Sequence, residues 1–278
     1  MKTDQNYTLI TGASTGLGKA LAINFARLGK NLILTALPGE NLKRTCSEIH
    51  AKYHVEVNPY ESDLTVSKKV KKFAQWVNSN FNIEVLINNA GIGGTFAFCE
   101  APLHYIDHII LLNVRAMVVL THMLMPNLLR QSKAYILNVA SIASFGPFPY
   151  KTVYPASKAF VYSFSRGLSN ELKNTSISVS VAHPGAMATN IDVCQRINSH
   201  SGILKSSVLC PDEVARICIK CLFKNQRCII PGFMNKLTWL ALKLFPFNLT
   251  MSFMGSVYKR EYYQKAGSNS PSVEFAGK

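Results

Sequence analysis

Short apolar runs alternate with longer amphipathic segments along most of the chain. Seven runs have the length and β-branched content of strands: 7–11 (YTLIT), 31–36 (NLILTA), 55–60 (VEVNPY), 85–88 (VLIN), 134–141 (AYILNVAS), 178–184 (SVSVAHP) and 228–230 (CII). Between them, apolar residues recur at helical spacing over 17–28, 40–53, 66–79, 103–130, 154–174 and 211–224. This alternation predicts an α/β fold, a doubly wound Rossmann-type sandwich with a mainly parallel sheet and helices on both faces. Such a sheet binds ligands beyond the carboxyl ends of its strands, where the strand order reverses.

The composition is that of a globular chain with one large core. Of the 278 residues, 48% are hydrophobic and only 16% charged, and no shift in composition requires a second core. Gly29 follows the first predicted helix, where a left-handed cap is favoured, and Pro211 opens the last one. Residues 266–278 are small and polar, which predicts a flexible tail.

The seven cysteines lack a regular spacing, which predicts reduced thiols rather than a disulfide framework. Cys218 and Cys221 form a C-x-x-C, but they stand among apolar residues at helical spacing, with no second pair or histidine nearby. Core packing is therefore favoured over metal or redox chemistry, and we expect no metal site.

The formal net charge of +15 would attract phosphate groups of a nucleotide, a nucleic acid or a lipid. Helical spacing spreads the densest basic run, KKVKK at 68–72, over more than one face, so a solvated surface is the favoured interpretation. No dense basic tract or recognition helix indicates nucleic-acid binding. The first strand begins near Tyr7 and leaves no room for a signal peptide, so a cytoplasmic location is expected.

The first strand runs directly into TGASTGLGKA, in which Gly12, Gly16 and Gly18 have the spacing G-x-x-x-G-x-G. Glycines suit a sharp turn whose backbone N–H groups approach a pyrophosphate at the start of a helix. Because the motif lies between a predicted strand and a predicted helix, nucleotide binding is favoured over an ordinary flexible turn.

The residues after the second strand bear on the choice of nucleotide. An acid there would bind the ribose 2′-hydroxyl of NAD, and an arginine would bind the 2′-phosphate of NADP. The chain has Ala36 and Leu37 instead. Without the acid, no carboxylate at this position repels a 2′-phosphate, and Lys19 and Lys43 are nearby cations that could bind it. NADP(H) is therefore favoured over NAD(H).

Further motifs follow the glycine turn in order: SDL at 62–64, NNAG at 88–91, Asn113, Ser141, Tyr154-x-x-x-Lys158 and PGAMAT at 184–189. Composition alone predicts about one Tyr-x-x-x-Lys pair by chance, so this pair means little by itself. The whole set, with each member at a strand end or helix start, is not expected by chance. Over residues 5–232 the chain resembles the classical branch of the short-chain dehydrogenase/reductase family.

The resemblance implies a seven-stranded sheet within a catalytic domain at 1–232. From the residues themselves we expect an apolar and basic helical extension of this domain at 233–265, followed by the flexible tail at 266–278. It implies a catalytic tetrad of Asn113, Ser141, Tyr154 and Lys158. The residues implied to bind a nicotinamide dinucleotide are Gly12, Ser14, Thr15, Gly16, Leu17, Gly18, Asp63, Leu64, Asn89, Ala90, Gly91, Tyr154, Lys158, Pro184, Gly185 and Thr189. Among them, Asp63 is implied near the adenine and Thr189 at the nicotinamide carboxamide. A homodimer or homotetramer is also implied.

The tetrad's residue types fit the interconversion of a carbonyl and an alcohol by hydride transfer. The alkoxide that forms must be protonated, which a hydroxyl acid within hydrogen-bond reach can do. The pKa of free tyrosine is about 10, and Lys158, on the same helical face as Tyr154, is expected to lower it and to bind the cofactor ribose. Ser141 would orient the substrate oxygen, and the resemblance suggests that Asn113 bends its helix and relays protons to Lys158. The alternative, a non-catalytic dinucleotide sensor, predicts a broken tetrad, whereas all four residues are present.

Apolar residues follow three of the predicted strands and indicate a lipophilic pocket. They are Ile92, Phe96, Phe98, Phe145, Phe148, Tyr150, Met187 and Ile191. A pocket without an anion clamp favours a lipophilic ketone, aldehyde or alcohol over a sugar or an organic acid. The alternative is that half of these side chains only pack a lid.

Residues 234–265 extend beyond the family core and mix apolar residues with Lys236, Lys243, Lys259 and Arg260. They could form a substrate lid, an oligomer contact or an interfacial membrane helix, so the protein could also be membrane-associated. The sequence does not choose among these three.

Overall fold

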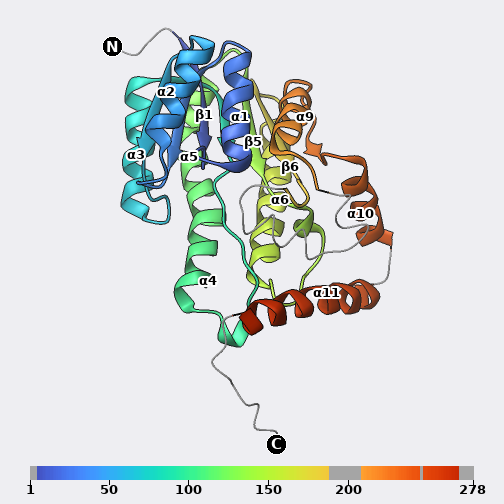
Figure 1. Ribbon diagram of the computed structural model, residues 1–278. Coiled ribbons are helices and arrows are strands. Elements are labelled where there is room, and N and C mark those ends of the chain that lie inside the picture. Colours follow the sequence, from blue (N-terminus) through green and yellow to red (C-terminus); the bar gives the residue numbers. More distant parts are fainter. Residues whose placement is uncertain (1–4, 188–207, 245–246, 269–278) are drawn as a thin grey trace, which may run out of the picture.

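Seven parallel strands form the sheet at the centre of the molecule (Figure 1). The computed structural model describes residues 5–187, 208–244 and 247–268. The strands are β1 (Asn6–Thr11), β2 (Asn31–Ala36), β3 (Val57–Glu61), β4 (Asn82–Asn88), β5 (Ala134–Val139), β6 (Ile177–Ala182) and β7 (Cys228–Ile229), in the order β3-β2-β1-β4-β5-β6-β7. The predicted doubly wound sheet is confirmed. The strand order reverses between β1 and β4, so a ligand cleft is expected at their carboxyl ends.

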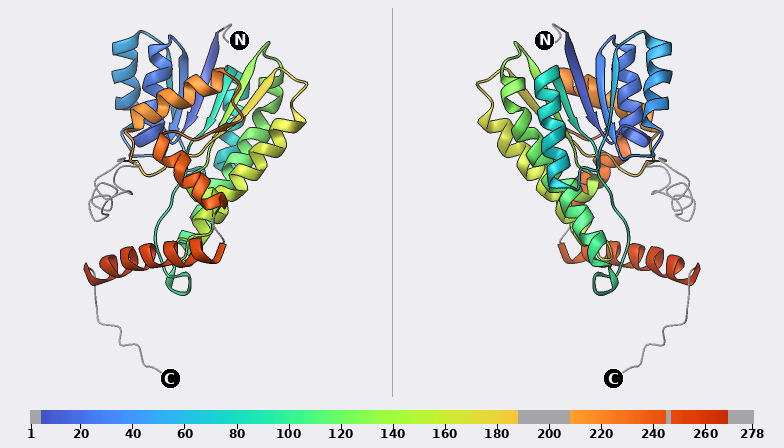
Figure 2. Two further views of the ribbon diagram at one scale, coloured as in Figure 1. Left: turned by 90° about the vertical axis from the view of Figure 1, so that its right-hand side faces the viewer. Right: turned by 90° about the vertical axis from the view of Figure 1, so that its left-hand side faces the viewer.

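Helices cover both faces of the sheet (Figure 2). On one face lie α1 (Gly16–Arg27), α2 (Leu42–Tyr53) and α9 (Pro211–Phe223), and on the other α3 (Ser67–Asn80), α5 (Met117–Leu129) and α6 (Val153–Glu171). Each face has its own core, because successive strand residues point to opposite faces: Ile10 packs with α1, and Leu9 packs with α3. The predicted helices are found within a few residues of their expected ends.

The long helix predicted over 103–130 is continuous but not uniformly α-helical. It consists of α4 (Leu103–Ile109), a π-helical segment (Ile110–Ala116) and α5. By length and hydropathy alone this run could cross a membrane. In the fold it is a core helix, because Leu120, Leu124 and Leu128 are buried against the sheet.

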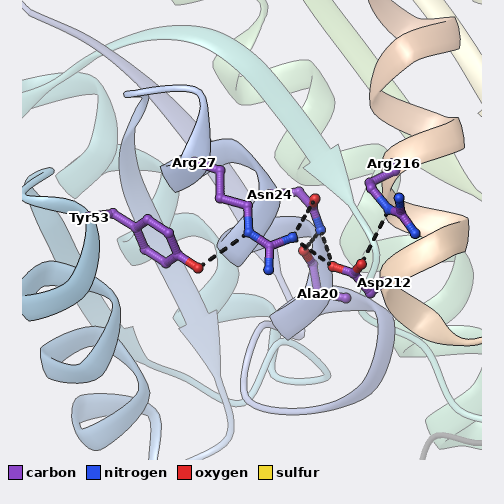
Figure 3. Close-up of polar contacts among 6 residues, drawn as sticks. All are labelled: Ala20, Asn24, Arg27, Tyr53, Asp212 and Arg216. Carbon is purple, nitrogen blue, oxygen red and sulfur yellow. Dashed lines mark hydrogen bonds and ion pairs between the residues drawn. The ribbon is translucent and has the colours of Figure 1, made fainter.

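A polar cluster at the start of α9 joins α9 to α1 and α2 (Figure 3). Asp212 accepts hydrogen bonds from Asn24 Nδ2 (2.8 Å) and Arg27 Nη1 (3.1 Å), and it forms an ion pair with Arg216 Nε (3.2 Å). Arg27 Nε also donates to the Tyr53 hydroxyl at 3.3 Å. A carboxylate at a helix N-terminus is favourable in itself, and here it also fixes the helix that begins at the glycine turn.

The C-x-x-C lies in the core, as predicted. Cys218 is buried on the inner face of α9, Cys221 packs partly buried beside it, and both thiols are free. Burial raises the pKa of Cys218 to about 12, so its thiol stays protonated. The lysines of the KKVKK run are exposed on α3 around a buried Val70, which confirms the solvated helix surface.

Two helices follow the Rossmann-type core: α10 (Phe233–Leu244) and α11 (Phe247–Ser268). Helix α10 packs beside the short turn after Ser141, the 3-10 segment Ile142–Phe145, and α11 crosses the lower end of the molecule (Figures 1 and 2). The predicted helical extension is therefore present. Helix α11 continues to Ser268, and the flexible tail stays a prediction.

Candidate functional site

A cleft of about 770 Å³ opens at the carboxyl ends of the strands. Among the residues implied by the resemblance, those that line it are Gly12, Ser14, Thr15, Gly16, Leu17, Gly18, Asp63, Leu64, Asn89, Ala90, Gly91, Ser141, Tyr154, Lys158, Pro184 and Gly185. Asn113 lies behind this wall, and Thr189 falls outside the described residues. Segments from six parts of the sequence thus meet in one cavity, while the role of each residue stays a prediction.

The glycine turn forms one end of the cleft. Gly12 has a φ of +64°, which a residue with a side chain rarely adopts. A Cβ atom on Gly18 would lie 1.9 Å from the carbonyl oxygen of Gly12, so only glycine allows the turn to pass this close to α1. Helix α1 begins here with no side-chain cap and no acid in its first turn. Its first N–H groups and its dipole therefore suit an anion in the cleft.

Asn89 supports this turn from the end of β4. Its Nδ2 donates to the carbonyl oxygens of Thr11 (2.9 Å) and Gly12 (3.0 Å), and its backbone N–H donates to Thr11 Oγ1 (3.0 Å). The NNAG motif therefore lines the cleft as expected, but the Asn89 amide is used to hold the turn.

Asp63 lies on the same side of the cleft. Its Oδ1 accepts from the backbone N–H (2.9 Å) and the hydroxyl (2.6 Å) of Thr65. Partial burial acts to raise its pKa, but these hydrogen bonds outweigh that effect, and the pKa lies below its ordinary value. Asp63 is therefore an ionised acceptor at neutral pH.

Glu40 is an acid in the cleft that the sequence interpretation missed. It lines the cavity beside Leu37, and its Oε2 accepts a hydrogen bond from Ser14 Oγ at 2.5 Å. The carboxylate therefore lies against the glycine turn, although it is four residues beyond the end of β2. The sequence does contain this glutamate, but we expected a ribose-binding acid only directly after the second strand, where Ala36 and Leu37 stand.

Tyr154 and Ser141 meet at the other end of the cleft. Tyr154 is the second residue of α6, and its hydroxyl is hydrogen-bonded to that of Ser141, which follows β5. The Ser141 Oγ also accepts from the backbone N–H of Ala143 at 3.1 Å, so the side chain is fixed at the start of the 3-10 turn. The structure thus brings a hydroxyl acid and a second hydroxyl into direct contact.

Lys158 lies one helical turn after Tyr154. Its Nζ is 5.9 Å from the centroid of the Tyr154 ring and donates to the Val139 carbonyl oxygen at 3.0 Å. Burial lowers the pKa of Lys158 to about 8, which leaves the amine mostly protonated at neutral pH. A buried cation in the cleft is consistent with an anionic or hydroxyl-rich ligand.

We expected Lys158 to lower the pKa of Tyr154. When only the residues of the protein act on Tyr154, this expectation is wrong. Burial is the largest influence and raises the pKa of Tyr154, while the hydrogen bond from Ser141 acts in the opposite direction. The physical reason is that the Lys158 ammonium is directed to Val139 rather than to the phenol oxygen. Tyr154 is therefore a protonated phenol at neutral pH, which suits a proton donor.

Asn113 occupies the middle of the π-helical segment. Its Oδ1 accepts from the Ile92 N–H (2.9 Å), and its Nδ2 donates to the Ile92 carbonyl (2.9 Å) and to Ser157 Oγ (3.0 Å). Ser157 in turn donates to the Tyr154 carbonyl at 2.7 Å. Asn113 therefore connects the loop after β4 to the helix that carries Tyr154 and Lys158. The predicted distortion of its helix appears as a π-helical turn, a feature frequent at functional sites.

His183 supports Ser141 from behind. Its Nδ1 lies 3.1 Å from the Ser141 carbonyl oxygen and 2.8 Å from Ser144 Oγ, and Ser144 also donates to that carbonyl at 2.6 Å. Because the carbonyl can only accept, Nδ1 carries the proton of a neutral ring. The other nitrogen, Nε2, is buried and finds no partner among the described residues. Burial accordingly lowers the pKa of His183 to about 4.

This histidine makes the fold sensitive to acid. The unfolded chain binds the proton with a pKa near 6.5 and the folded chain only near 4, so the stabilisation is complete above pH 6.5 and is lost as the pH falls towards 4. We expect the free energy of unfolding in urea to fall by about 2 kcal/mol between pH 7.5 and pH 5. In His183→Asn the fall should largely disappear. An equal fall in both proteins would assign the acid sensitivity to other groups.

The apolar wall of the cleft contains part of the predicted set. Ile92, Phe148 and Met187 line it, together with Met254, Val257 and Tyr258 of α11, which the sequence interpretation did not assign to the pocket. Phe145 instead packs on His183, Tyr162 and Trp239, while Phe96, Phe98 and Tyr150 line a small separate hollow beside Tyr154. Ile191 lies outside the described residues. The alternative that half of these residues pack around the cleft is therefore close to the observed arrangement.

Helix α11 closes the open side of this wall through aromatic contacts. Tyr258 stacks on Phe148 with ring centroids 5.4 Å apart, and Tyr262 stacks on Tyr150 at 5.3 Å. Lys151 Nζ lies 4.8 Å from the centroid of the Tyr258 ring. The extension therefore forms part of the apolar wall of the cleft.

The chain is similar in sequence to known dehydrogenases and reductases. A family model described as short chain dehydrogenase matches residues 6–199. A very-long-chain 3-oxoacyl-CoA reductase of Anas platyrhynchos is 34% identical over 189 residues, which are 66% of this chain and 61% of that protein. An NADP-dependent 3-hydroxy acid dehydrogenase of Schizosaccharomyces pombe is 29% identical over 82% of this chain and 91% of its own length.

Among solved structures, a short-chain dehydrogenase from Sphingobium yanoikuyae in complex with NADPH has a similar fold. The TM-score is 0.76 at 26% identity, and the match covers 99% of both chains. The similarity therefore extends through the C-terminal helices, whereas the match to the Anas reductase spans less than two thirds of that protein.

Proposed function

The chain belongs to the short chain dehydrogenase family, and within it we propose that the protein is an oxidoreductase that interconverts a carbonyl and an alcohol with a nicotinamide dinucleotide. The observation that carries the proposal is the convergence of Ser141, Tyr154 and Lys158 in the same cleft as the glycine turn. The alternative, a dinucleotide sensor without catalysis, is disfavoured because the cleft holds a complete set of proton-handling residues. A membrane-surface protein on the same fold is the other alternative.

The cleft has features that fit the dinucleotide at both ends. The uncapped start of α1 and the close approach of Gly18 to Gly12 suit the diphosphate. The buried amine of Lys158 suits ribose hydroxyls, and Thr189, Pro184 and Gly185 are proposed beside the nicotinamide. When bound, the nicotinamide supplies or accepts the hydride.

The protein's own residues handle the proton and orient the substrate. In reduction, Tyr154 donates its proton to the substrate oxygen, while Ser141 hydrogen-bonds to the same oxygen and holds it beside the phenol. The neutral form of Tyr154, favoured by burial, is the form that this direction requires. Lys158 would bind the ribose of the cofactor beside the phenol, and Asn113 holds the loop and helix that position both residues.

We propose a lipophilic substrate, because apolar side chains from Ile92 to Tyr258 line the far end of the cleft. The relative that acts on very-long-chain 3-oxoacyl-CoA has a substrate of this character. We expect the protein to reduce lipophilic ketones or aldehydes with a higher kcat/KM than sugars or organic acids. The measurement is the loss of absorbance of the reduced nicotinamide. Cofactor binding without turnover of any carbonyl or alcohol would instead support the sensor.

For the cofactor we propose NADP(H) in preference to NAD(H). No acid follows β2 directly, and the names of two similar proteins include NADP or NADPH. Glu40 favours NAD(H) instead, since a carboxylate beside Ser14 repels the 2′-phosphate of NADP(H). Neither Lys19, which pairs with Glu48, nor Lys43 lines the cleft among the described residues.

Glu40→Gln is therefore expected to raise the ratio of kcat/KM for NADPH over NADH, which should already exceed one in the unmodified protein. Removal of one partly solvated charge should raise the ratio about fivefold, equivalent to about 1 kcal/mol, and less at high salt. Glu171→Gln, at the far end of α6, is the matched control and should leave the ratio unchanged. A wild-type preference for NADH would overturn the proposed cofactor, and an unmoved ratio in Glu40→Gln would remove Glu40 from its selection.

We further propose a homodimer or homotetramer, and peripheral membrane contact through the C-terminal extension. Exposed apolar side chains on the π-helical segment and α6, Ile110 and Phe160, support an oligomer contact on that side. Apolar side chains on α10 support the membrane contact.

A further inference from the structure

Helix α10 has an exposed apolar face. Phe233, Leu237, Leu240 and Leu244 recur at i, i+4, i+7 and i+11, which places all four on one side of the helix. All are exposed, with 73%, 43%, 44% and 72% of their surface accessible. Scattered exposed leucines are ordinary, whereas a continuous stripe of four on one helix marks a contact surface.

The same face is basic. Lys236 and Lys243 are exposed along one edge of the stripe, where Lys243 Nζ lies 4.6 Å from the centroid of the Trp239 ring, and α10 contains no aspartate or glutamate. The surrounding part of the chain, residues 193–278, holds 12 Lys/Arg against 4 Asp/Glu, a surplus of +8. An apolar stripe flanked by lysines complements the boundary between anionic headgroups and acyl chains.

The opposite face of α10 belongs to the cleft. Asn235 and Thr238 line the cavity, and the Trp239 ring lies with its edge towards Phe145, at 6.3 Å between centroids. Asn235 is buried and donates to the Pro231 carbonyl oxygen at 2.7 Å, which fixes the start of the helix. Among the described residues, the inner side of α10 therefore contacts the rest of the protein, while its outer side is exposed.

We propose that the outer face of α10 docks the protein on the surface of an anionic phospholipid membrane. Phe233, Leu237, Leu240 and Leu244 enter the boundary of the acyl chains, and the two lysines contact the phosphate headgroups. The proposal identifies the surface and the lipid chemistry of the membrane contact. As a consequence, a lipophilic substrate would pass from the bilayer to a cleft that the same helix lines. Only this consequence rests on the proposed function.

A second copy of the chain is the less suitable occupant of this face. In a two-fold dimer the stripe would face itself, and Lys236 and Lys243 would approach the same lysines of the partner without an acid on α10 to neutralise them. The exposed residues that suit an oligomer, Ile110 and Phe160, lie on the π-helical segment and α6. Figure 1 shows α4 and α5 on the left of the molecule and α10 at its right edge.

The test is vesicle flotation of the full chain, which requires no enzymatic activity. We expect binding to phosphatidylcholine vesicles that contain phosphatidylserine, weaker binding at high salt, and little binding to phosphatidylcholine alone. The double variant Leu237→Gln/Leu240→Gln keeps the charge and removes apolar contact, so its partition coefficient should fall at least tenfold. Lys236→Gln/Lys243→Gln should lower it about fivefold per lysine on the anionic vesicles only.

The matched control is Leu28→Gln/Leu129→Gln, which changes two leucines of similar exposure, 55% and 47%, on other parts of the surface. It should bind like the unmodified protein. Absence of flotation on anionic vesicles, or an equal loss in the control and the α10 leucine variant, would overturn the proposal. Conversion of a dimer to a monomer by Leu237→Gln/Leu240→Gln, with vesicle binding unchanged, would overturn it in favour of a second copy. Since flotation and turnover are measured separately, failure of this proposal leaves the enzymatic one standing.

Discussion

Tyr154→Phe should lose most turnover while keeping the fold and the affinity for the cofactor. The change removes one oxygen atom, which is the proposed proton donor and the partner of Ser141. Proton transfer by a positioned side chain contributes roughly 10²–10⁴-fold to rate, so kcat should fall by that range. The measurement is kcat and KM with the best substrate of the screen, together with cofactor affinity by fluorescence titration.

The control for this prediction lies two turns further along the same helix. Tyr162 packs against Phe145 and His183 and does not line the cleft, so Tyr162→Phe should leave kcat nearly unchanged. Near-normal turnover in Tyr154→Phe would eliminate the proposed acid. Loss of turnover together with loss of cofactor binding would show that Tyr154 acts mainly as a cofactor ligand.

Gly18→Ala should abolish useful cofactor binding. The new Cβ would lie 1.9 Å from the Gly12 carbonyl oxygen, and two non-bonded atoms cannot both stay in place at that distance. The turn must open, and the N–H groups at the start of α1 move with it. Loss of two hydrogen bonds to an anionic ligand, at roughly 1.5–3 kcal/mol each, lowers affinity about a hundredfold or more. Titration with NADPH and NADH measures the effect.

A second glycine provides the matched control. Gly167 lies exposed in α6, and a Cβ atom there would meet nothing within 4 Å. Gly167→Ala should leave cofactor affinity unchanged and raise the free energy of unfolding by about 1 kcal/mol, because alanine is the better helix former. Urea denaturation of both variants separates a loss of binding from a loss of folding. Unchanged affinity in a folded Gly18→Ala would contradict the assignment of the turn to the diphosphate.

Local pattern was enough to predict the sheet, because each strand and helix buries its own apolar side. The continuous apolar run at 31–36 marks a strand that is covered on both faces, and helical spacing along 211–224 marks one face that must be covered. The π-helical segment was only partly foreseen, since its position depends on the bonds between Asn113 and Ile92, 21 residues apart in sequence. The path of α10 and α11 was not predictable, because it depends on long-range contacts: Phe145 with Trp239 of α10, and Phe148 and Tyr150 with Tyr258 and Tyr262 of α11.

The sequence by itself determined the order of the elements and the glycine turn, because these follow from residue types at fixed local spacing, whereas Ser141, Tyr154 and Lys158 were singled out by the resemblance to the family. Only the tertiary structure brought Glu40 against Ser14, placed His183 behind Ser141 and turned Lys158 towards Val139. Burial and long-range hydrogen bonding decide such contacts, and with them the pKa values of Tyr154 and His183. They also decided which side of α10 faces the cleft and which side faces outward.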